Sequence, residues 1–202
     1  MTAIKRIRRA VPASSHRILG IDASLTSTGY AYRNSNDLYA GTVAPGKLKG
    51  PYRLAYIRDR IREVVAFARP TLVVMEDYAM GRSAKISMPF HIGELGGVIK
   101  TLLWDLGHDV MLVPPTSLKM IVAGHGFAKK PDMRVALELT FGHIITQDDE
   151  ADAAGLMLVG ELASGVPVVS PEVYRELRLD TLTTFPVVPG KLQSIANRIQ
   201  KA

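Results

Sequence analysis

The chain has 202 residues, of which 47% are apolar, enough for one domain of ordinary size with a sizeable core. It contains no cysteine, which excludes disulfides, thiolate zinc sites and cysteine nucleophiles. No apolar run approaches the roughly 20 residues that span a bilayer, and the basic N-terminus lacks the apolar stretch of a signal peptide. We therefore expect a soluble intracellular protein, whose net charge of +6 favours a polyanionic partner.

The N-terminal half is predicted to contain most of the strands. Residues 1–16 are expected to form a flexible basic arm. Strands are expected at about 17–22, 29–33 and 37–43, where short apolar runs are separated by turn residues. A helix opened by Pro51 then continues to about residue 68, with apolar residues at helical spacing, and a strand follows at 71–76.

The C-terminal half is predicted to be mostly helical. A long helix is expected at about 84–106, with an apolar face wide enough for the core and a dimer interface. A strand at 110–113 and helices at about 117–122, 130–140 and 148–163 complete the domain, which spans 17–165. Residues 166–202 form a proline-punctuated extension with a short helix near 190–200. This order predicts an α/β fold with a mixed five-stranded sheet flanked by helices.

Four acidic residues occupy the places where a metal-dependent nuclease needs carboxylates. Asp22 and Glu76 each end an apolar strand, and Asp149 and Asp152 lie three residues apart on one face of a predicted helix start. A carboxylate at the end of a hydrophobic strand is costly to desolvate unless a cation or hydrogen bonds compensate it. Hard oxygen ligands favour Mg²⁺ or Mn²⁺ over zinc. The pattern therefore predicts phosphodiester hydrolysis assisted by two metal ions.

The helix that begins near residue 148 is predicted to lie close to the sheet. Its first turns contain small residues: Ala151, Ala153, Ala154 and Gly155. Close packing of this helix would bring Asp149 and Asp152 beside the two acidic strand ends. The sequence thus predicts that four carboxylates converge on one spot.

Each acid also has an ordinary structural interpretation. Asp22 could cap the turn at 24–28, and Glu76 could mark where a strand reaches solvent. Acids in the first turn of a helix, here with Thr146 as a candidate cap, are stabilised by the helix dipole. Asp152 is harder to explain in this way, because it lies one turn inside the helix among small residues. Taken together, the four acids favour the metal site.

The same stretches resemble RuvC-type Holliday junction resolvases. The resemblance is carried by GIDASLTSTGYA at 20–31, VME at 74–76, PTSLKMIVAGHGFAKK at 115–130 and DEADAAGL at 149–156. These motifs occur in the family's order and spacing over about residues 17–163. The match as a whole is more specific than any single motif.

The resemblance implies an RNase H-like fold, a homodimer, and Mg²⁺-dependent cutting of two strands of a four-way DNA junction, with Mn²⁺ as a substitute. It places the protein in the cytoplasm of a bacterium or a phage-infected cell. It implies metal binding by four residues: Asp22, Glu76, Asp149 and Asp152. It also implies that Lys119 and Lys130 face the scissile phosphate or its neighbours, where they would offset charge on the phosphoryl oxygens.

Two positions differ from the pattern of cellular members. These commonly carry a histidine where this chain has Asp149, so the all-carboxylate set is more similar to the bacteriophage branch. Family members also use an aromatic residue just after the second acid to disrupt base pairing at the crossover. Here Ala79 is closest to that position and Tyr78 lies beside it, which leaves the strand-separating residue open.

Three other functions fit part of the sequence. The same acids would serve a less selective nuclease that cuts flaps, forks or other branched DNA. A junction-binding module without catalytic activity is the non-enzyme alternative, although it would not need all four acids. A sugar-kinase or chaperone-like ATPase shares the motif at 20–29, but such proteins need a second phosphate loop and a much longer chain.

Overall fold

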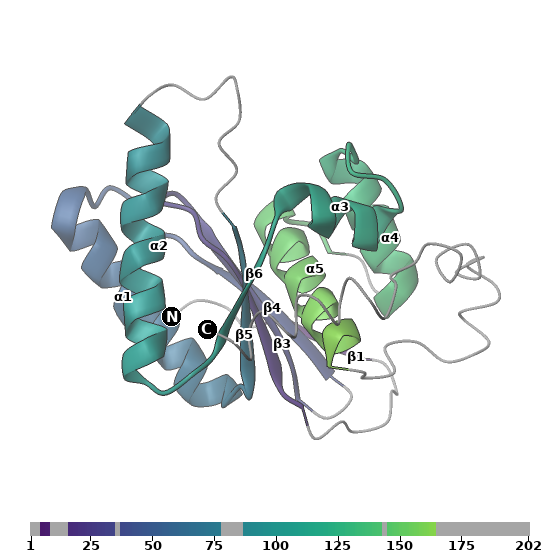
Figure 1. Ribbon diagram of the computed structural model, residues 1–202, viewed down its shortest axis with the longest axis horizontal. Coiled ribbons are helices and arrows are strands. Elements are labelled where there is room, and N and C mark those ends of the chain that lie inside the picture. Colours follow the sequence, from purple (N-terminus) through teal and green to yellow (C-terminus); the bar gives the residue numbers. More distant parts are fainter. Residues whose placement is uncertain (1–4, 9–15, 35–36, 78–86, 143–144, 165–202) are drawn as a thin grey trace.

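The computed structural model describes residues 5–8, 16–34, 37–77, 87–142 and 145–164 (Figure 1). Its strands are β1 (Lys5–Arg8), β2 (Ile18–Asp22), β3 (Thr28–Asn34), β4 (Asp37–Val43), β5 (Leu72–Glu76) and β6 (Val110–Val113). Its helices are α1 (Gly50–Ala68), α2 (Ser87–Asp105), α3 (Pro115–Ala123), α4 (Lys130–Phe141) and α5 (Asp148–Ala163). In the part of the chain that these elements cover, no helix has the length and apolar character to cross a membrane.

The strands form one mixed sheet in the order β1-β4-β3-β2-β5-β6. Strands β1 to β4 pair antiparallel, whereas β5 pairs parallel with both β2 and β6. Helices α1 and α2 cover one face of the sheet, and α3, α4 and α5 cover the other (Figure 1). The expected α/β architecture, a mixed sheet flanked by helices, is confirmed.

The sheet has six strands rather than the five expected, because residues 5–8 pair with β4. The register joins Lys5 to Ala40 and Arg8 to Asp37. A basic composition favours a flexible arm, but the outer edge of β4 offers backbone groups with which another strand can pair. The expectation of a flexible arm is therefore wrong for these four residues. The rest of the arm and the C-terminal extension, including the helix expected near 190–200, lie outside the described residues.

The remaining elements begin and end close to their expected positions. Helix α3 starts two residues earlier than expected, with Pro115 in its first turn, where a missing amide proton costs nothing. Glycines in the left-handed conformation, Gly124 and Gly142, end α3 and α4. Helix α2 begins at Ser87, and residues 84–86 of the expected long helix lie outside the described part.

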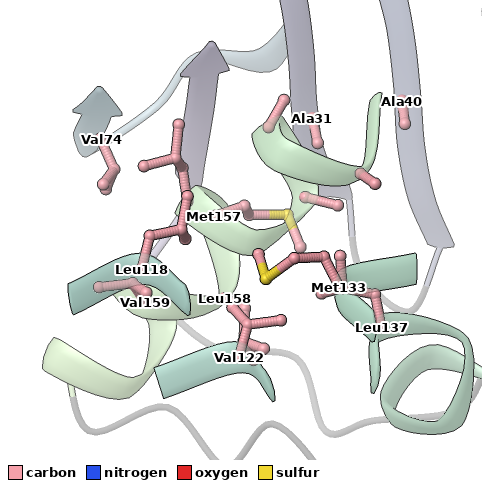
Figure 2. Close-up of a cluster of buried hydrophobic side chains, with 14 of the residues drawn as sticks. Ala31, Ala40, Val74, Leu118, Val122, Met133, Leu137, Met157, Leu158 and Val159 are labelled. Atoms are coloured by element: carbon pink, nitrogen blue, oxygen red, sulfur yellow. The ribbon is translucent and has the colours of Figure 1, made fainter. Parts of the chain in front are cut away.

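Two hydrophobic cores lie on the two faces of the sheet, because successive strand residues point in opposite directions. On β2, Leu19 and Ile21 belong to the core under α1 and α2. Ile18 belongs to the other core, and so does Val74 of β5. Figure 2 shows this second core, in which side chains of the strands and of α3 and α4 surround α5.

Helix α5 is the central element of the second core. It packs against the sheet on one side and against α3 and α4 on the other. Every residue from 150 to 161 is buried except Asp152, which is only half-buried. Asp152 is therefore the one residue of the stretch 150–161 whose side chain is not fully buried.

Candidate active site

Asp22 and Glu76 lie at the ends of two neighbouring parallel strands. The β2–β5 register pairs Ile21 with Met75, so the two acids that follow come to the same edge of the sheet. Alternation along the strands places Asp22 on the face of Ile18, and Glu76 on the face of Val74. Both acids therefore lie on the face that α5 covers.

The start of α5 reaches these two acids because the strands beneath it carry glycine. Gly29 of β3 pairs with Asp22 across the sheet, and a Cβ at Gly29 would collide with the backbone carbonyl of Asp149. A Cβ at Gly20 would likewise collide with the Ala153 carbonyl. The backbone of α5 thus lies directly on β2 and β3, which brings the acids of its first turns to the ends of these strands.

The small residues of α5 divide between two contacts. Ala153 lies against Gly20 of the sheet, which confirms the expected close approach. Gly155 instead faces α3, where an added Cβ would lie 3.2 Å from side-chain atoms of Leu118 and Val122. The sequence could not distinguish these directions, because α5 is buried on nearly all sides.

Burial and mutual repulsion of the acids show that they share one electrostatic site. Burial raises the pKa of Asp22 to about 8, with further contributions from the charges of Glu76, Asp152 and Asp149. Burial also raises the pKa of Glu76 to about 7, and the charge of Asp152 adds to this. The pKa of Asp152 is raised as well, first by burial and then by the charges of Asp148 and Asp149. Asp22 therefore lies within range of the charges of the other three predicted acids.

The two predicted lysines lie at the border of this acidic site. The charge of Lys130 lowers the pKa of Asp22 and of Asp152. The charge of Lys119, on α3, lowers the pKa of Glu76 and of Asp152. Both lysines thus act on the site from the helices that cover the same face of the sheet.

Lys130 forms an ion pair with Asp148, an acid that was not among the predicted site residues. Asp148, the first residue of α5, lies 3.3 Å from the Lys130 Nζ and 3.4 Å from the Arg134 Nη1. Burial lowers the pKa of Lys130, but the hydrogen bond and charge of Asp148, with the charges of Asp152 and Asp149, raise it overall. The only sequence signal for this contact was the acidic first turn, which is ordinary in helices.

The structure bears on two of the alternative interpretations. The turn at 24–28 is closed by Thr28, whose Oγ1 donates to the Ser24 carbonyl at 2.6 Å and accepts from the Ser24 amide at 3.2 Å. The N-cap residue of α5 is Gln147, one residue after the candidate Thr146, and its side chain makes no capping bond. The Thr146 carbonyl instead accepts a hydrogen bond from the Arg134 Nη1 at 3.3 Å.

Within the described residues, no three acidic or histidine side chains already form a group compact enough to hold a metal ion. The acids interact through their charges without making a closed ligand set. Tyr78 and Ala79, considered above for strand separation, lie outside the described residues.

Comparison with known proteins places the whole of this site inside one family. Residues 18–159 match the family described as "Crossover junction endodeoxyribonuclease RuvC". A RuvC of Parasynechococcus marenigrum is 30% identical over 153 residues, covering 71% of this chain and 97% of that one. A RuvC of Rickettsia conorii is 29% identical over 147 residues, covering 69% and 92%.

Solved structures show the same fold. The RuvC of Thermus thermophilus superposes with a TM-score of 0.60 at 23% identity, covering 74% of this chain and 97% of that one. The structure of the same protein in complex with a Holliday junction gives a TM-score of 0.63 at 23% identity, covering 71% and 91%. These likenesses confirm the expected RNase H-like fold class.

Proposed function

The chain belongs to the RuvC family of crossover junction endodeoxyribonucleases, and we infer from this that it resolves four-way (Holliday) DNA junctions by endonucleolytic cuts. One observation supports the proposal above all others. Asp22, Glu76, Asp149 and Asp152 come from three separate elements and reach one edge of the sheet. All four lie within the matched stretch.

The residues at this edge suit a hard divalent cation. The candidate ligands are carboxylates only, which favours Mg²⁺, with Mn²⁺ as a substitute. Burial and repulsion raise the pKa of Asp22 and of Glu76, so a cation would relieve an unfavourable charge that the two lysines offset only in part. Asp22, Glu76, Asp149 and Asp152 would hold the metal, which when bound activates the attacking water and stabilises the leaving oxygen. Binding would have to draw these carboxylates closer than they are in the free chain.

The lysines are proposed to stabilise the negative charge that develops on the scissile phosphate. Lys130 is 60% exposed, and its partner Asp148 is itself partly accessible, so the ammonium can reach a phosphate oxygen. Exposed ion pairs of this kind are worth little, typically below about 1 kcal/mol, and so do not prevent the exchange of partners. Lys119 would act from α3, where its charge lowers the pKa of Glu76 and of Asp152.

The DNA arms would be guided by basic residues outside the site, mostly through phosphates and therefore without reading sequence. Two arginines of α1 are partly neutralised within the helix, since Arg58 pairs with Asp59 and Arg60 with Glu63. A junction needs two symmetric cuts, and we propose a homodimer with two-fold symmetry for this reason. Location in the cytoplasm and membership of the bacteriophage branch, suggested by Asp149, stay predictions.

Substrate choice tests the function. Wild-type protein should introduce paired, symmetric nicks into a labelled synthetic four-way junction with Mg²⁺, and should leave a fork, a flap and a linear duplex largely intact. Equal cutting of all branched substrates would instead identify a general debranching nuclease. Tight binding of the junction without any cutting would mean that the protein is a binding module.

A further inference from the structure

Phe127 is an exposed aromatic side chain on the short connection between α3 and α4. Its exposed fraction is 91%, the highest among the large apolar residues of the described chain, whereas the adjacent Ala128 is 2% exposed. Single exposed apolar residues are common on protein surfaces. Phe127 differs from such residues because it lies near the acidic site and next to basic residues.

The connection that carries Phe127 is firmly held. Gly124 ends α3 in the left-handed conformation, with its amide donating to the Met120 carbonyl at 3.1 Å. The Ala128 amide donates to the His125 carbonyl at 3.2 Å, and the Lys129 amide donates to the Asp132 Oδ2 at 2.8 Å. Since both ends are anchored and Ala128 is buried, Phe127 is presented to solvent by a defined backbone.

Two independent contacts place this connection beside the acidic site. On one side, Gly126 packs against Thr116 in the first turn of α3, which directly follows β6 and its pairing with Glu76. On the other side, Lys130 comes three residues after Phe127, and its Nζ lies 3.3 Å from Asp148, the residue before Asp149. Phe127 therefore lies at the rim of the site.

The surroundings of Phe127 indicate a nucleic acid as its partner. His125 and Lys129 are exposed on the same connection, and Lys130 is exposed at the start of α4. Two acids lie beside these cations, Asp132 at the Lys129 amide and Asp148 at the Lys130 ammonium. An aromatic ring among cations is the arrangement with which proteins hold single nucleotides, where the ring stacks on a base and the cations bind the backbone.

We propose that Phe127 stacks on an open base face at the branch point of the DNA, next to the phosphate that is cut. In a continuous duplex both faces of each base are covered by neighbouring bases, so an open face occurs only at a branch, a nick or an end. Phe127 thereby helps to distinguish branched DNA from linear duplex. This assignment rests on the proposed nuclease function, and it concerns binding and positioning rather than chemistry.

Binding measurements on Phe127→Ala, Phe127→Trp and the matched control Phe67→Ala test the assignment. Phe67 is also exposed, at 65%, but it lies on α1, across the sheet from the site. Affinity is measured by fluorescence anisotropy with full-length protein and Ca²⁺, which also takes oxygen ligands. The probes are a four-way junction with 2-aminopurine at its branch point and a linear duplex of the same sequence. Thermal unfolding of each variant is recorded alongside.

Loss of one stacked base corresponds to a weakening of about 5- to 150-fold. We expect Phe127→Ala to weaken junction binding within this range, with duplex binding, unfolding temperature and the salt dependence of log K unchanged, because no phosphate contact is lost. The 2-aminopurine emission should differ between wild type and Phe127→Ala complexes, and Phe127→Trp should restore wild-type binding. Phe67→Ala should bind within about twofold of wild type.

Equal junction affinity and equal 2-aminopurine emission for wild type and Phe127→Ala would overturn the assignment. A parallel loss of junction and duplex affinity would also overturn it, since the contact would then not depend on a branch. If wild type binds and cuts the junction, either of these two results would exclude the proposed role of Phe127 but leave the proposed nuclease function standing. If wild type neither binds nor cuts the junction, the proposed function fails as well.

Discussion

Asp22 ends β2 among three other acids, and folding changes its acid–base behaviour more than that of any other acid with a stated value in the described chain. Burial and repulsion raise its pKa to about 8, from an ordinary value of 3.8. Without metal, the folded chain therefore retains a proton on Asp22 that the unfolded chain releases near pH 4. The stability linked to this proton is fully present below about pH 4 and is lost as the pH rises through about 8.

Replacement of Asp22 should remove this pH dependence. In the presence of a chelator, we expect wild type to lose stability between pH 5 and pH 8 relative to Asp22→Asn, which carries no titrating group there. The measurement is the urea midpoint of both proteins at the two pH values. Glu76, whose pKa is raised in the same direction to about 7, provides the same loss in both proteins and cancels in the comparison. Parallel pH dependence of the two proteins would show that Asp22 is not buried among charges.

At the scale of single residues, the sequence located the candidate acids but not their neighbours. A carboxylate at the end of an apolar strand stands out because its desolvation needs compensation. The contact of Asp148 with Lys130 and Arg134 was not predictable, because it depends on how the starts of α4 and α5 meet in space. Phe127 was likewise not identified, since nothing in its local sequence shows whether its ring is buried.

At the scale of elements, the contact of α5 with the sheet decides whether the four acids meet. Gly29 allows this contact, because a side chain there would collide with the Asp149 backbone. We expect Gly29→Ala to push the start of α5 away from β3, with a loss of stability of about 1–3 kcal/mol typical of overpacking and a marked loss of junction cutting. Urea unfolding and single-turnover cutting measure the two effects.

Gly97→Ala is the matched control for this substitution. Gly97 lies inside α2, and an added Cβ there meets nothing within 4 Å. This change should keep the cutting rate and raise stability slightly, because alanine favours a helix more than glycine. If Gly29→Ala folds and cuts as well as Gly97→Ala, α5 does not depend on close packing to position its acids.

A buried ion pair joins β3 and α5 near the ends that are remote from the site. The Arg33 Nε and Nη2 donate to the Glu161 Oε1 and Oε2 at 2.8 and 3.1 Å, and the side chains are only 11% and 5% exposed. The guanidinium also lies over the Phe141 ring, 5.3 Å from its centroid. The pair therefore links the end of α5 to the sheet and to α4.

Breaking this pair should lower stability without affecting the chemistry. We expect Arg33→Met to cost about 3–5 kcal/mol, because it leaves the Glu161 carboxylate buried without its partner. The double change Arg33→Met with Glu161→Leu should recover most of this loss. Urea unfolding of both variants is the measurement, and similar stability of the single and double variants would contradict this account of the pair.

Most elements were predictable because hydrophobic periodicity and turn residues mark them. Strands β2 to β6 and the helices around them followed from such signals. Strand β1 was not predictable in this way, because these four residues form a strand only by pairing with the edge of β4. The neighbour of Gly155 was not predictable either, because a helix that is buried on all sides has no single apolar face from which its orientation could be inferred.

At the scale of the whole molecule, one sheet face carries the site and its lysines while the other carries α1 and α2. The four candidate acids, the two lysines and Phe127 lie on the side that α3, α4 and α5 cover. The chain has a net charge of +6, which counteracts the repulsion between DNA and this group of carboxylates. A bound cation and the two lysines would together compensate the negative charge of the carboxylates, so that a phosphate could bind at this edge of the sheet.

The claim that these carboxylates form the cutting site is tested most directly by metal-dependent, single-turnover cleavage of a labelled four-way junction. Wild type is compared with Asp149→Asn, which removes one charge with little change of shape, and with Asp105→Asn at the end of α2. We expect wild type and Asp105→Asn to make the same paired cuts with Mg²⁺, and Asp149→Asn to be slower by at least about 100-fold with junction binding retained. Cutting by Asp149→Asn at the wild-type rate would contradict the account.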